Sequence, residues 1–143
     1  MPSFTATIPN LQRSGPIVEV LIMPSRKLIE VLQNRNQQIS QPVRVLAMID
    51  TGATSSVVNS KIIQDLGLNP IGTVKINTPS STGLTCYQYQ AGIVFPNNIV
   101  VETDELIEVP LQEQNIQCLI GRDVLKFGVL IYNGYTQTIT FSL

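Results

Sequence analysis

The sequence predicts a mainly β fold with two or three short helices. Most of its apolar runs are short and rich in β-branched residues, as is typical of strands. Gly, Pro, Asn and Ser separate these runs, and helical spacing of apolar residues occurs only in brief segments. A chain of 143 residues, 43% of them hydrophobic, suits one core. We therefore expect a single domain over residues 1–143, with residues 1–42 as an N-terminal extension of a core at residues 43–143.

The N-terminal extension begins with a polar stretch. Residues 1–15 contain proline and glycine and predict a loosely held arm or an edge strand. Ile17–Met23 predicts a strand. Ser25 is suited to cap a helix over Arg26–Gln33, in which apolar residues recur at helical spacing and predict one buried face. These apolar residues are Leu28, Val31 and Leu32.

The next segment centres on an apolar strand, Val43–Asp50, that runs directly into an acidic residue. After a Thr-Gly turn, Ser56–Val58 predicts a short strand. Asn59 or Ser60 then caps a helical turn that Gly67 closes.

A long hairpin follows, formed by Thr73–Asn77 and Leu84–Phe95 around a small polar tip at Thr78–Gly83. Taken alone, this tip equally describes an ordinary exposed turn. Ile99–Val101 and Glu105–Leu111 predict two further strands, and a proline in the second indicates a sheet edge.

The C-terminal part predicts a buried strand at Gln117–Ile120 and a short helix at Arg122–Phe127. Val129–Tyr132 and Tyr135–Phe141 predict a terminal hairpin, because the Asn-Gly pair between them suits a two-residue type I′ turn.

Composition excludes several function classes. Only 13% of residues are charged and the net charge is -1, so we expect neither nucleic acid nor a membrane as a partner. No apolar run has the length of a membrane span, and the N-terminus lacks the pattern of a secretory signal, so we expect a cytoplasmic location. With no such signal, Cys86 and Cys118 are expected to be free, half-buried thiols.

The chain contains no histidine. This rules out Ser-His-Asp or Cys-His catalysis in the usual form and histidine metal ligands, and two isolated cysteines do not make a zinc site. We therefore expect no metal and no cofactor. The acid–base chemistry that remains is that of carboxylates.

One carboxylate has an unusual position. Asp50 ends an apolar strand, where its charge is costly unless it is hydrogen-bonded or shared. Taken by themselves, the three residues Asp50-Thr51-Gly52 also predict a simple turn. A second apolar strand meets a glycine in the same way, at residues 119–123.

Three segments carry a resemblance to a known family: Ile49–Ala53, the hairpin around Pro79–Gly83, and Leu119–Leu125. In these the chain resembles retropepsin-like aspartic proteases, in particular the small bacterial relatives of retroviral proteases. The resemblance covers roughly Val43–Phe141. It implies a closed barrel with a flap hairpin and an aspartic endopeptidase, a peptide hydrolase. No second Asp-Thr-Gly occurs, so it also implies a homodimer in which each chain supplies half of the active site.

The chemistry of amide hydrolysis requires the same pairing. Without a metal or a side-chain nucleophile, one group must take a proton from water while another protonates the carbonyl oxygen. Two close carboxylates divide these roles, because they cannot both ionise comfortably and share one proton. We therefore expect a dyad of Asp50 from two chains acting on a peptide or protein substrate.

The resemblance also implies roles for neighbouring residues. Thr51 locks the turns of the two chains together, and Gly52 lets backbone approach the carboxylates. Ala53 and Thr54 contact substrate, and the flap closes over it. Gly121, Arg122 and Asp123 support the site structurally, with an ion pair as the expected role of the charged pair. The flap residues are Pro79, Ser80, Ser81, Thr82 and Gly83.

Three departures limit the comparison. Ala53 stands where pepsin-like members often carry a hydroxyl that hydrogen-bonds the ionised dyad, so we expect an activity optimum less acidic than theirs. Thr54 stands near where retroviral members carry an Asp, which removes the usual partner of Arg122. Residues 1–40 have three open roles: to cover the dimer interface, to occupy the cleft as a propeptide, or to extend the sheet.

Two other functions remain open at this stage. One is a catalytically inactive retropepsin-like module for dimerisation or peptide binding, since a fold does not establish an activity. The other is a phosphoryl-transfer enzyme with an Asp nucleophile, which ranks last because a second acidic residue and a phosphate-binding glycine loop are missing.

Overall fold

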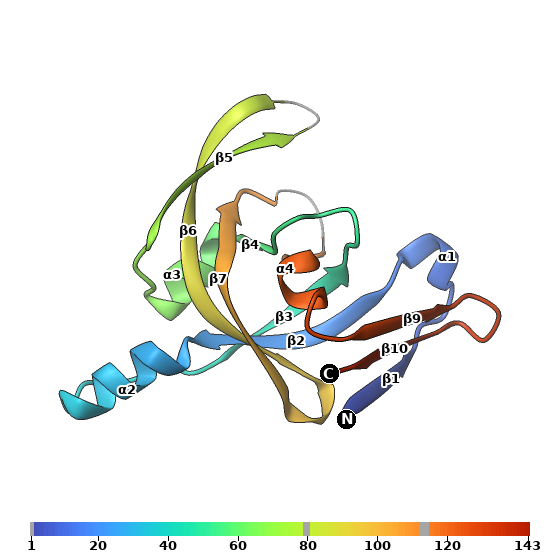
Figure 1. The fold of residues 1–143 in the computed structure, drawn as a ribbon, viewed down its shortest axis with the longest axis horizontal. Helices are drawn as coiled ribbons and strands as arrows, with labels where there is room; N and C mark the ends of the chain where they lie inside the picture. Colours follow the sequence, from blue (N-terminus) through green and yellow to red (C-terminus); the bar gives the residue numbers. More distant parts are fainter. Residues whose placement is uncertain (1, 79–80, 112–114) are drawn as a thin grey trace.

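The computed structural model describes residues 2–78, 81–111 and 115–143, and its main sheet closes on itself (Figure 1). Leu21–Pro24 of the first strand of this sheet pair with Ala91–Val94 of the sixth, so six strands form a ring and the seventh extends from it. The predicted mainly β fold is confirmed, and this ring agrees with the predicted closed barrel. The strands in sheet order are β2 (Ile17–Pro24), β3 (Val43–Ile49), β8 (Cys118–Ile120), β4 (Val57–Asn59), β7 (Ile99–Val109), β6 (Ser81–Phe95) and β5 (Gly72–Thr78).

Two pairs of neighbouring strands in the barrel are parallel, β4 with β7 and β3 with β8, and the second pair decides where the site lies. β3 and β8 pair from Ala47 opposite Cys118 to Ile49 opposite Ile120. Parallel neighbours end at the same edge of a sheet, so the turn after β3 and the turn after β8 meet there. The predicted strands before Asp50 and before Gly121 are both confirmed.

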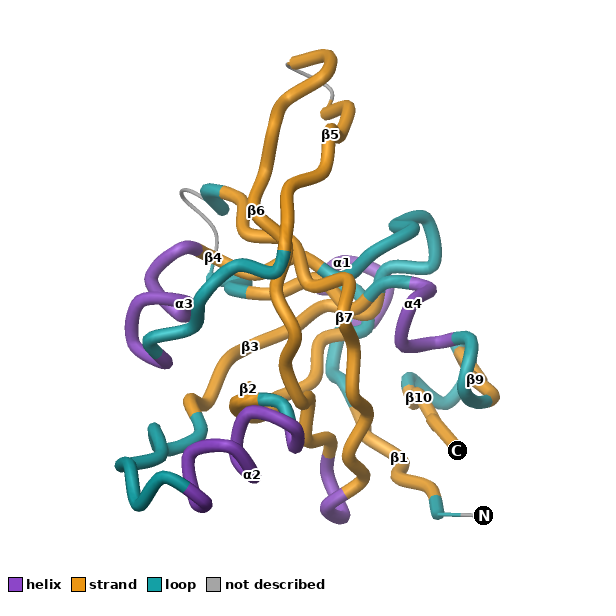
Figure 2. The backbone as a smooth tube through the Cα atoms, turned by 60° about the vertical axis from the view of Figure 1, so that its left-hand side comes forward, coloured by secondary structure: helices purple, strands orange, loops and turns teal. Residues whose placement is uncertain are grey.

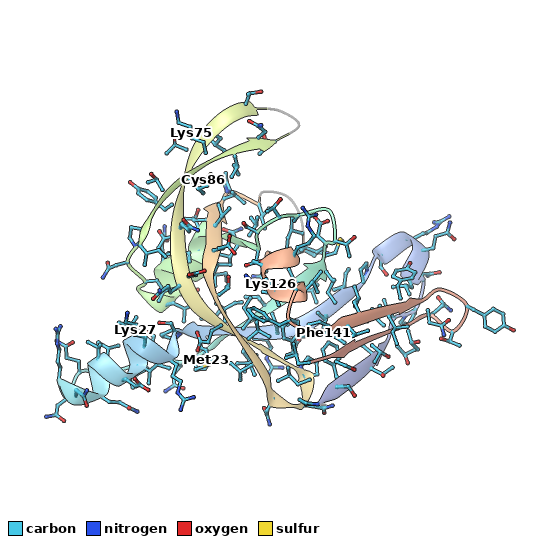
Figure 3. All side chains as sticks on the ribbon, viewed as in Figure 1. Met23, Lys27, Lys75, Cys86, Lys126 and Phe141 are labelled. Atoms are coloured by element: carbon cyan, nitrogen blue, oxygen red, sulfur yellow. The ribbon has the colours of Figure 1, made fainter. Side chains whose placement is uncertain are left out.

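A second, three-stranded sheet contains both ends of the chain, in the order β1 (Ser3–Thr7), β10 (Thr138–Ser142) and β9 (Val129–Asn133). Three rings, those of Phe4, Phe95 and Phe141, join it to the barrel, with centroids 5.3 to 6.3 Å apart. Figure 3 shows Phe141 where this sheet meets the barrel. The predicted edge strand within residues 1–15 is confirmed as β1, whereas the helical turn α1 (Leu11–Ser14) was not predicted.

The N-terminal extension is part of the barrel wall. β2 pairs with both β3 and β6, and its side chains Val18, Val20 and Ile22 are among the most buried in the chain. Strands β1 and β2 thus extend the two sheets, which is one of the three roles left open for residues 1–40.

Helix α2 (Arg26–Asn34) is capped as predicted, since the Ser25 side chain accepts from the Leu28 N–H. The prediction that its apolar face is buried holds only in part: Leu28 packs against the core, whereas Val31 is 37% exposed and no residue of the helix is fully buried. The reason is its position. The helix projects from the barrel (Figures 1 and 2), and Glu102 holds its first turn by accepting from the Arg26 N–H.

Helix α3 (Ser60–Leu66) has the predicted boundaries, with Asn59 as its cap and Gly67 in the left-handed conformation at its end. The predicted hairpin is also confirmed as β5 and β6, which rise from the barrel in Figure 2. Among the helices of the described residues, none has the length and apolar character that a membrane span requires.

Two predictions about strands were wrong. The strands expected on either side of residues 102–104 form one continuous strand, β7. Its pairing with β6 shifts register there, because a step of three residues along β7, from Thr103 to Leu106, is matched by a step of two along β6, from Ala91 to Tyr89. β7 lies between β4 and β6, so it is not an edge, and Pro110 follows its end.

The terminal hairpin exists, but its turn is longer than predicted. Thr138 pairs with Asn133, leaving a loop over residues 134–137 in which Gln137 has the positive φ of 57°. Asn133 uses its side chain to accept from the Thr136 N–H at 3.1 Å, which favours this wider loop over a two-residue type I′ turn.

Candidate active site

Asp50 is half-buried and directly follows Ile49, the last residue of β3. Its backbone N–H donates to the carbonyl of Ile120, 2.8 Å away at the end of β8. Its carboxylate oxygen Oδ1 accepts from the Gly52 N–H at 2.9 Å, and no other hydrogen bond reaches the carboxylate from the described residues. The carboxylate is thus held in one direction while its second oxygen remains available to a reacting molecule.

Gly52 leaves room for the Asp50 carboxylate. A Cβ at this position would lie 3.2 Å from Asp50 Oδ1, so the carboxylate would have to shift by a few tenths of an ångström. Thr51 is exposed beside it, and the Ala53 N–H donates to the Asp50 carbonyl at 3.2 Å to close the turn.

Gly121 brings the turn after β8 into contact with the loop after Asp50. A Cβ on Gly121 would lie 2.6 Å from the backbone carbon of Ser55, so no larger residue fits. Two backbone hydrogen bonds close the same contact. They run from the Arg122 N–H to the Ala53 carbonyl (2.9 Å) and from the Asp123 N–H to the Thr54 carbonyl (3.1 Å).

A cavity of about 440 Å³ opens between the Asp50 loop and the β5–β6 hairpin. Its walls are mostly aliphatic and small polar side chains, which suits a peptide side chain. Cavities of similar size lie elsewhere, so its position beside Asp50, and not its volume, marks it as the candidate cleft. The lining residues are Gly52, Ala53, Thr54, Ser55, Val57, Val74, Lys75, Ile76, Asn77 and Ile107.

The structure places the flap residues only in part. Pro79 and Ser80 lie outside the described residues, and of Ser81 only the strand position at the start of β6 is described. Thr82 and Gly83 are exposed, and Gly83, with a φ of 69°, donates its N–H to the Asn77 side chain.

The sequence profile of a known family, described as aspartyl protease, matches residues 36–124, more than half of the chain. The chain belongs to the aspartyl protease family. The matched region contains Asp50, the β5–β6 hairpin and the Gly121 turn. No curated protein matches the sequence.

Solved structures agree on the fold of this aspartyl protease family member, which is retropepsin-like. A retropepsin-like aspartic protease from Rickettsia conorii is similar over 99% of this chain and 94% of that chain, with a TM-score of 0.52 and 12% identity. A foamy viral protease-reverse transcriptase is similar over 78% of this chain and 12% of that chain, with a TM-score of 0.50 and 15% identity. At these identities the likeness concerns the fold alone.

Arg122 ties the Asp50 turn of this family member to helix α4 (Arg122–Leu125). Its guanidinium donates to the Thr51 carbonyl at 2.7 Å and to the Thr54 hydroxyl at 3.2 Å. Arg122 forms no ion pair within the part of the chain that the structure describes, where neutral oxygens of the turn accept its hydrogen bonds instead of the expected carboxylate.

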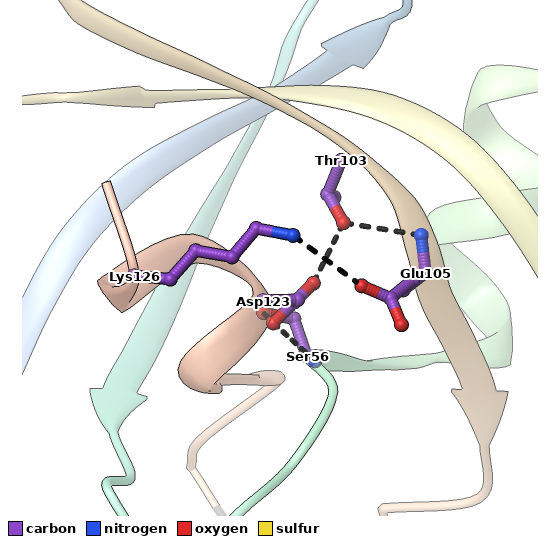
Figure 4. A network of polar contacts seen from close by, with 5 residues as sticks. All are labelled: Ser56, Thr103, Glu105, Asp123 and Lys126. Carbon is purple, nitrogen blue, oxygen red and sulfur yellow. Dashed lines mark hydrogen bonds and ion pairs between the residues drawn. The ribbon is translucent and has the colours of Figure 1, made fainter.

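Asp123 is 4% exposed and has three donors, none of them a cation (Figure 4). Its Oδ1 accepts from the Ser56 N–H and the Ser56 hydroxyl, both at 2.8 Å, and its Oδ2 accepts from the Thr103 hydroxyl at 2.6 Å. The expected ion pair was wrong here too, since hydrogen bonds compensate the burial of this carboxylate.

The network around Asp123 continues into the site. The Ser56 hydroxyl also accepts from the Gly121 N–H at 2.9 Å, so one side chain links the carboxylate to both turns. Thr103 likewise accepts from the Glu105 N–H at 3.1 Å. Sequence reasoning missed Ser56 and Thr103, because nothing in a local pattern signals a hydroxyl that bonds across three segments.

Other acidic residues do not complete the site within the described chain. Asp65 is exposed on α3, Asp104 is exposed on β7, and Asp123 has both oxygens engaged. No group of three or more metal-binding side chains occurs among the described residues. One chain thus offers one available carboxylate at the end of β3.

Both cysteines are free and fully buried, where half-buried thiols were expected. Burial, together with the charge of Asp123, raises the pKa of the Cys118 thiol to about 12. Burial and the charge of Glu108 also raise the pKa of Cys86. Both thiols are therefore poor nucleophiles at neutral pH.

Proposed function

We propose that this protein is a homodimeric aspartic endopeptidase that hydrolyses peptide bonds with water activated by Asp50 from two chains. The observation that carries the proposal is the setting of Asp50: a carboxylate at the open end of a barrel strand, oriented by Gly52, beside a cleft beneath a hairpin. Membership of the aspartyl protease family supports it.

The reaction divides between the two carboxylates. The ionised Asp50 takes a proton from water, whose oxygen attacks the peptide carbonyl carbon. The partner's Asp50, protonated, donates its proton to the carbonyl oxygen, which gives a neutral tetrahedral intermediate. As this intermediate collapses, one of its hydroxyls gives its proton to the ionised carboxylate, the carbonyl re-forms and the C–N bond breaks. The leaving amine takes the proton held by the other carboxyl, so the dyad again shares one proton. The carboxyl product and the amine then depart.

The neighbouring residues have supporting roles in this proposal. Thr51 joins the two turns, and Arg122 fixes the carbonyl side of the same turn. Ala53 and Thr54 line the cleft and contact the substrate, while the β5–β6 hairpin closes over it. Gly121 and Asp123 hold the second turn against the first.

The test is the cleavage of a mixed peptide library across the acid and neutral pH range, with a metal chelator present throughout. We expect cleavage that the chelator does not reduce, with an optimum less acidic than that of pepsin-like enzymes, because Ala53 offers no hydroxyl to stabilise the ionised dyad. A lack of cleavage by folded protein at high concentration, with library peptides still bound, would instead support the non-enzymatic peptide-binding module. An optimum deep in the acid range would contradict the role given to Ala53.

A further inference from the structure

A slot separates β1 from β2, two strands that diverge from the helical turn α1 (Figure 1). No strand pairing joins β1 to β2 among the residues that the structure describes. A cavity of about 430 Å³ lies in this slot, lined by residues 6–8, residues 17–21 and residues 94–98. Its volume is typical of ligand sites, and none of its lining residues belongs to the candidate cleft. The slot is therefore a second concave feature, separate from the cleft beside Asp50.

The first half of β2 has an open hydrogen-bonding edge. β6 pairs with β2 only from Leu21 onward, where Leu21 stands opposite Val94. Two residues further in the same register, Pro96 would stand opposite Glu19. Proline has no N–H to donate, and the chain turns away there in the 3₁₀ turn η1 (Pro96–Asn98). The edge of β2 beside Glu19 is thus left without a neighbouring strand.

Backbone polar groups of β2 point into the slot at this edge. The Pro16 carbonyl accepts from the Ile49 N–H at the end of β3, at 3.0 Å. Hydrogen bonds alternate in direction along an antiparallel strand, so Val18 and Val20 also bond toward β3. The N–H and C=O of Glu19 therefore point to the opposite side, where β6 is absent.

β1 presents a second open edge to the same slot. On one side it pairs with β10, and the Ile8 N–H donates to the Gln137 carbonyl at 2.9 Å on that side. By the same alternation, the N–H and C=O of Thr7 point away from β10. The Ser3 carbonyl has the same direction, and it accepts from the Asn97 side chain of η1 at 2.9 Å. The outer edge of β1 thus faces the turn that closes the slot.

The lining of the slot suits an uncharged strand. Half-buried aliphatic residues, Ile17, Leu21 and Val94, contribute to it. Among the described residues that line the cavity, Glu19 and Arg44 alone are ionisable, and they pair with each other at 2.7 Å. Because this pair is neutral as a whole, charge complementarity favours an occupant without charged side chains.

We propose that the slot binds an extended, uncharged peptide segment of a partner protein, which pairs with β2 beside Glu19 in the place that β6 vacates. The segment runs antiparallel to β2, as β6 does, and its other edge faces β1 at Thr7. Backbone hydrogen bonds supply affinity, and alternate side chains contact the aliphatic residues of the slot. Since slot and cleft share no lining residue, this interaction does not depend on peptidase activity.

The test uses the uncharged peptide acetyl-Thr-Val-Thr-Val-Thr-amide as the probe. It is added to the isotope-labelled full chain carrying Asp50→Asn, so that the peptide stays intact, and amide resonances are followed by nuclear magnetic resonance. We expect shifts at Glu19 and Thr7 that saturate with peptide concentration. Shifts confined to cleft residues such as Ile107, or no shifts at all, would overturn the proposal.

The matched control is the same peptide with an N-methyl group on both valines. Methylation removes the N–H donors of one edge and keeps the side chains, so the peptide should bind at least about tenfold more weakly. This comparison leaves the protein unaltered and does not depend on the folding of a slot variant. Equal binding of the two peptides would show that strand pairing is not involved and would contradict the proposal.

A variant of the slot lining locates the binding site independently. Val94→Lys places an unpaired charge among the aliphatic residues of the slot and should weaken binding of the unmethylated peptide by about tenfold or more. Val31→Lys on α2, a similarly exposed valine outside the slot, should leave the dissociation constant unchanged. An unaltered dissociation constant in folded Val94→Lys, or equal losses in both variants, would place the peptide elsewhere and overturn the proposal.

Discussion

Asp50→Asn should lower the rate of peptide cleavage by about 10² to 10⁴-fold or more, because the amide can neither take a proton from water nor share one with a partner carboxylate. The fold should persist, since Asp50 is at the end of its strand and its one side-chain hydrogen bond comes from the adjacent turn. The measurement is kcat for a defined peptide found in the library, with circular dichroism as the check on folding.

Two other aspartates provide matched controls for this variant. Asp65 and Asp104 are exposed and lie on α3 and β7, away from the Asp50 turn. Asp65→Asn and Asp104→Asn should retain the wild-type rate. Cleavage that survives in Asp50→Asn, or is lost equally in all three variants, would remove Asp50 from the mechanism.

Ser56→Ala should reduce the free energy of unfolding by about 2 to 3 kcal/mol, a large share of the stability of a small domain. The variant removes one donor to the buried Asp123 carboxylate and leaves the Gly121 N–H without its acceptor. Urea denaturation of the wild-type protein and of Ser56→Ala under the same conditions measures the difference between their free energies of unfolding.

Ser55, the residue before Ser56, provides the control for the expected loss of stability in Ser56→Ala. Ser55 is half-buried, and its side chain makes no hydrogen bond among the described residues. Ser55→Ala should therefore change the free energy of unfolding by less than about 0.5 kcal/mol. Equal effects of the two substitutions would show that the hydroxyl network contributes nothing beyond the loss of side-chain volume.

The sequence predicts best the strands and helix caps whose signals come from residues close by in the chain. The apolar strands before Asp50 and Gly121, the Ser25 cap and the Asn59 cap depend on neighbours within a few residues. Their pairing into one site followed from the resemblance, and the parallel β3–β8 pair accounts for it physically.

The features that sequence did not predict depend on contacts between distant segments. Asp123 is satisfied by Ser56 and Thr103, which come from different parts of the chain, so its charge alone suggested an ion pair. Helix α2 has an apolar face by periodicity, but periodicity does not say what covers it. The open edges of β1 and β2 became visible only once the pairing of both strands was known.

The central claim is that one active unit needs Asp50 from two chains. Mixing wild-type protein with Asp50→Asn at constant total concentration, and allowing the subunits to exchange, tests it most directly. If mixed dimers are inactive, an equal mixture should retain about one quarter of the wild-type activity, because only dimers of two wild-type chains work. Retention of about one half, with activity linear in the wild-type fraction, would mean that each chain works alone and would contradict the account.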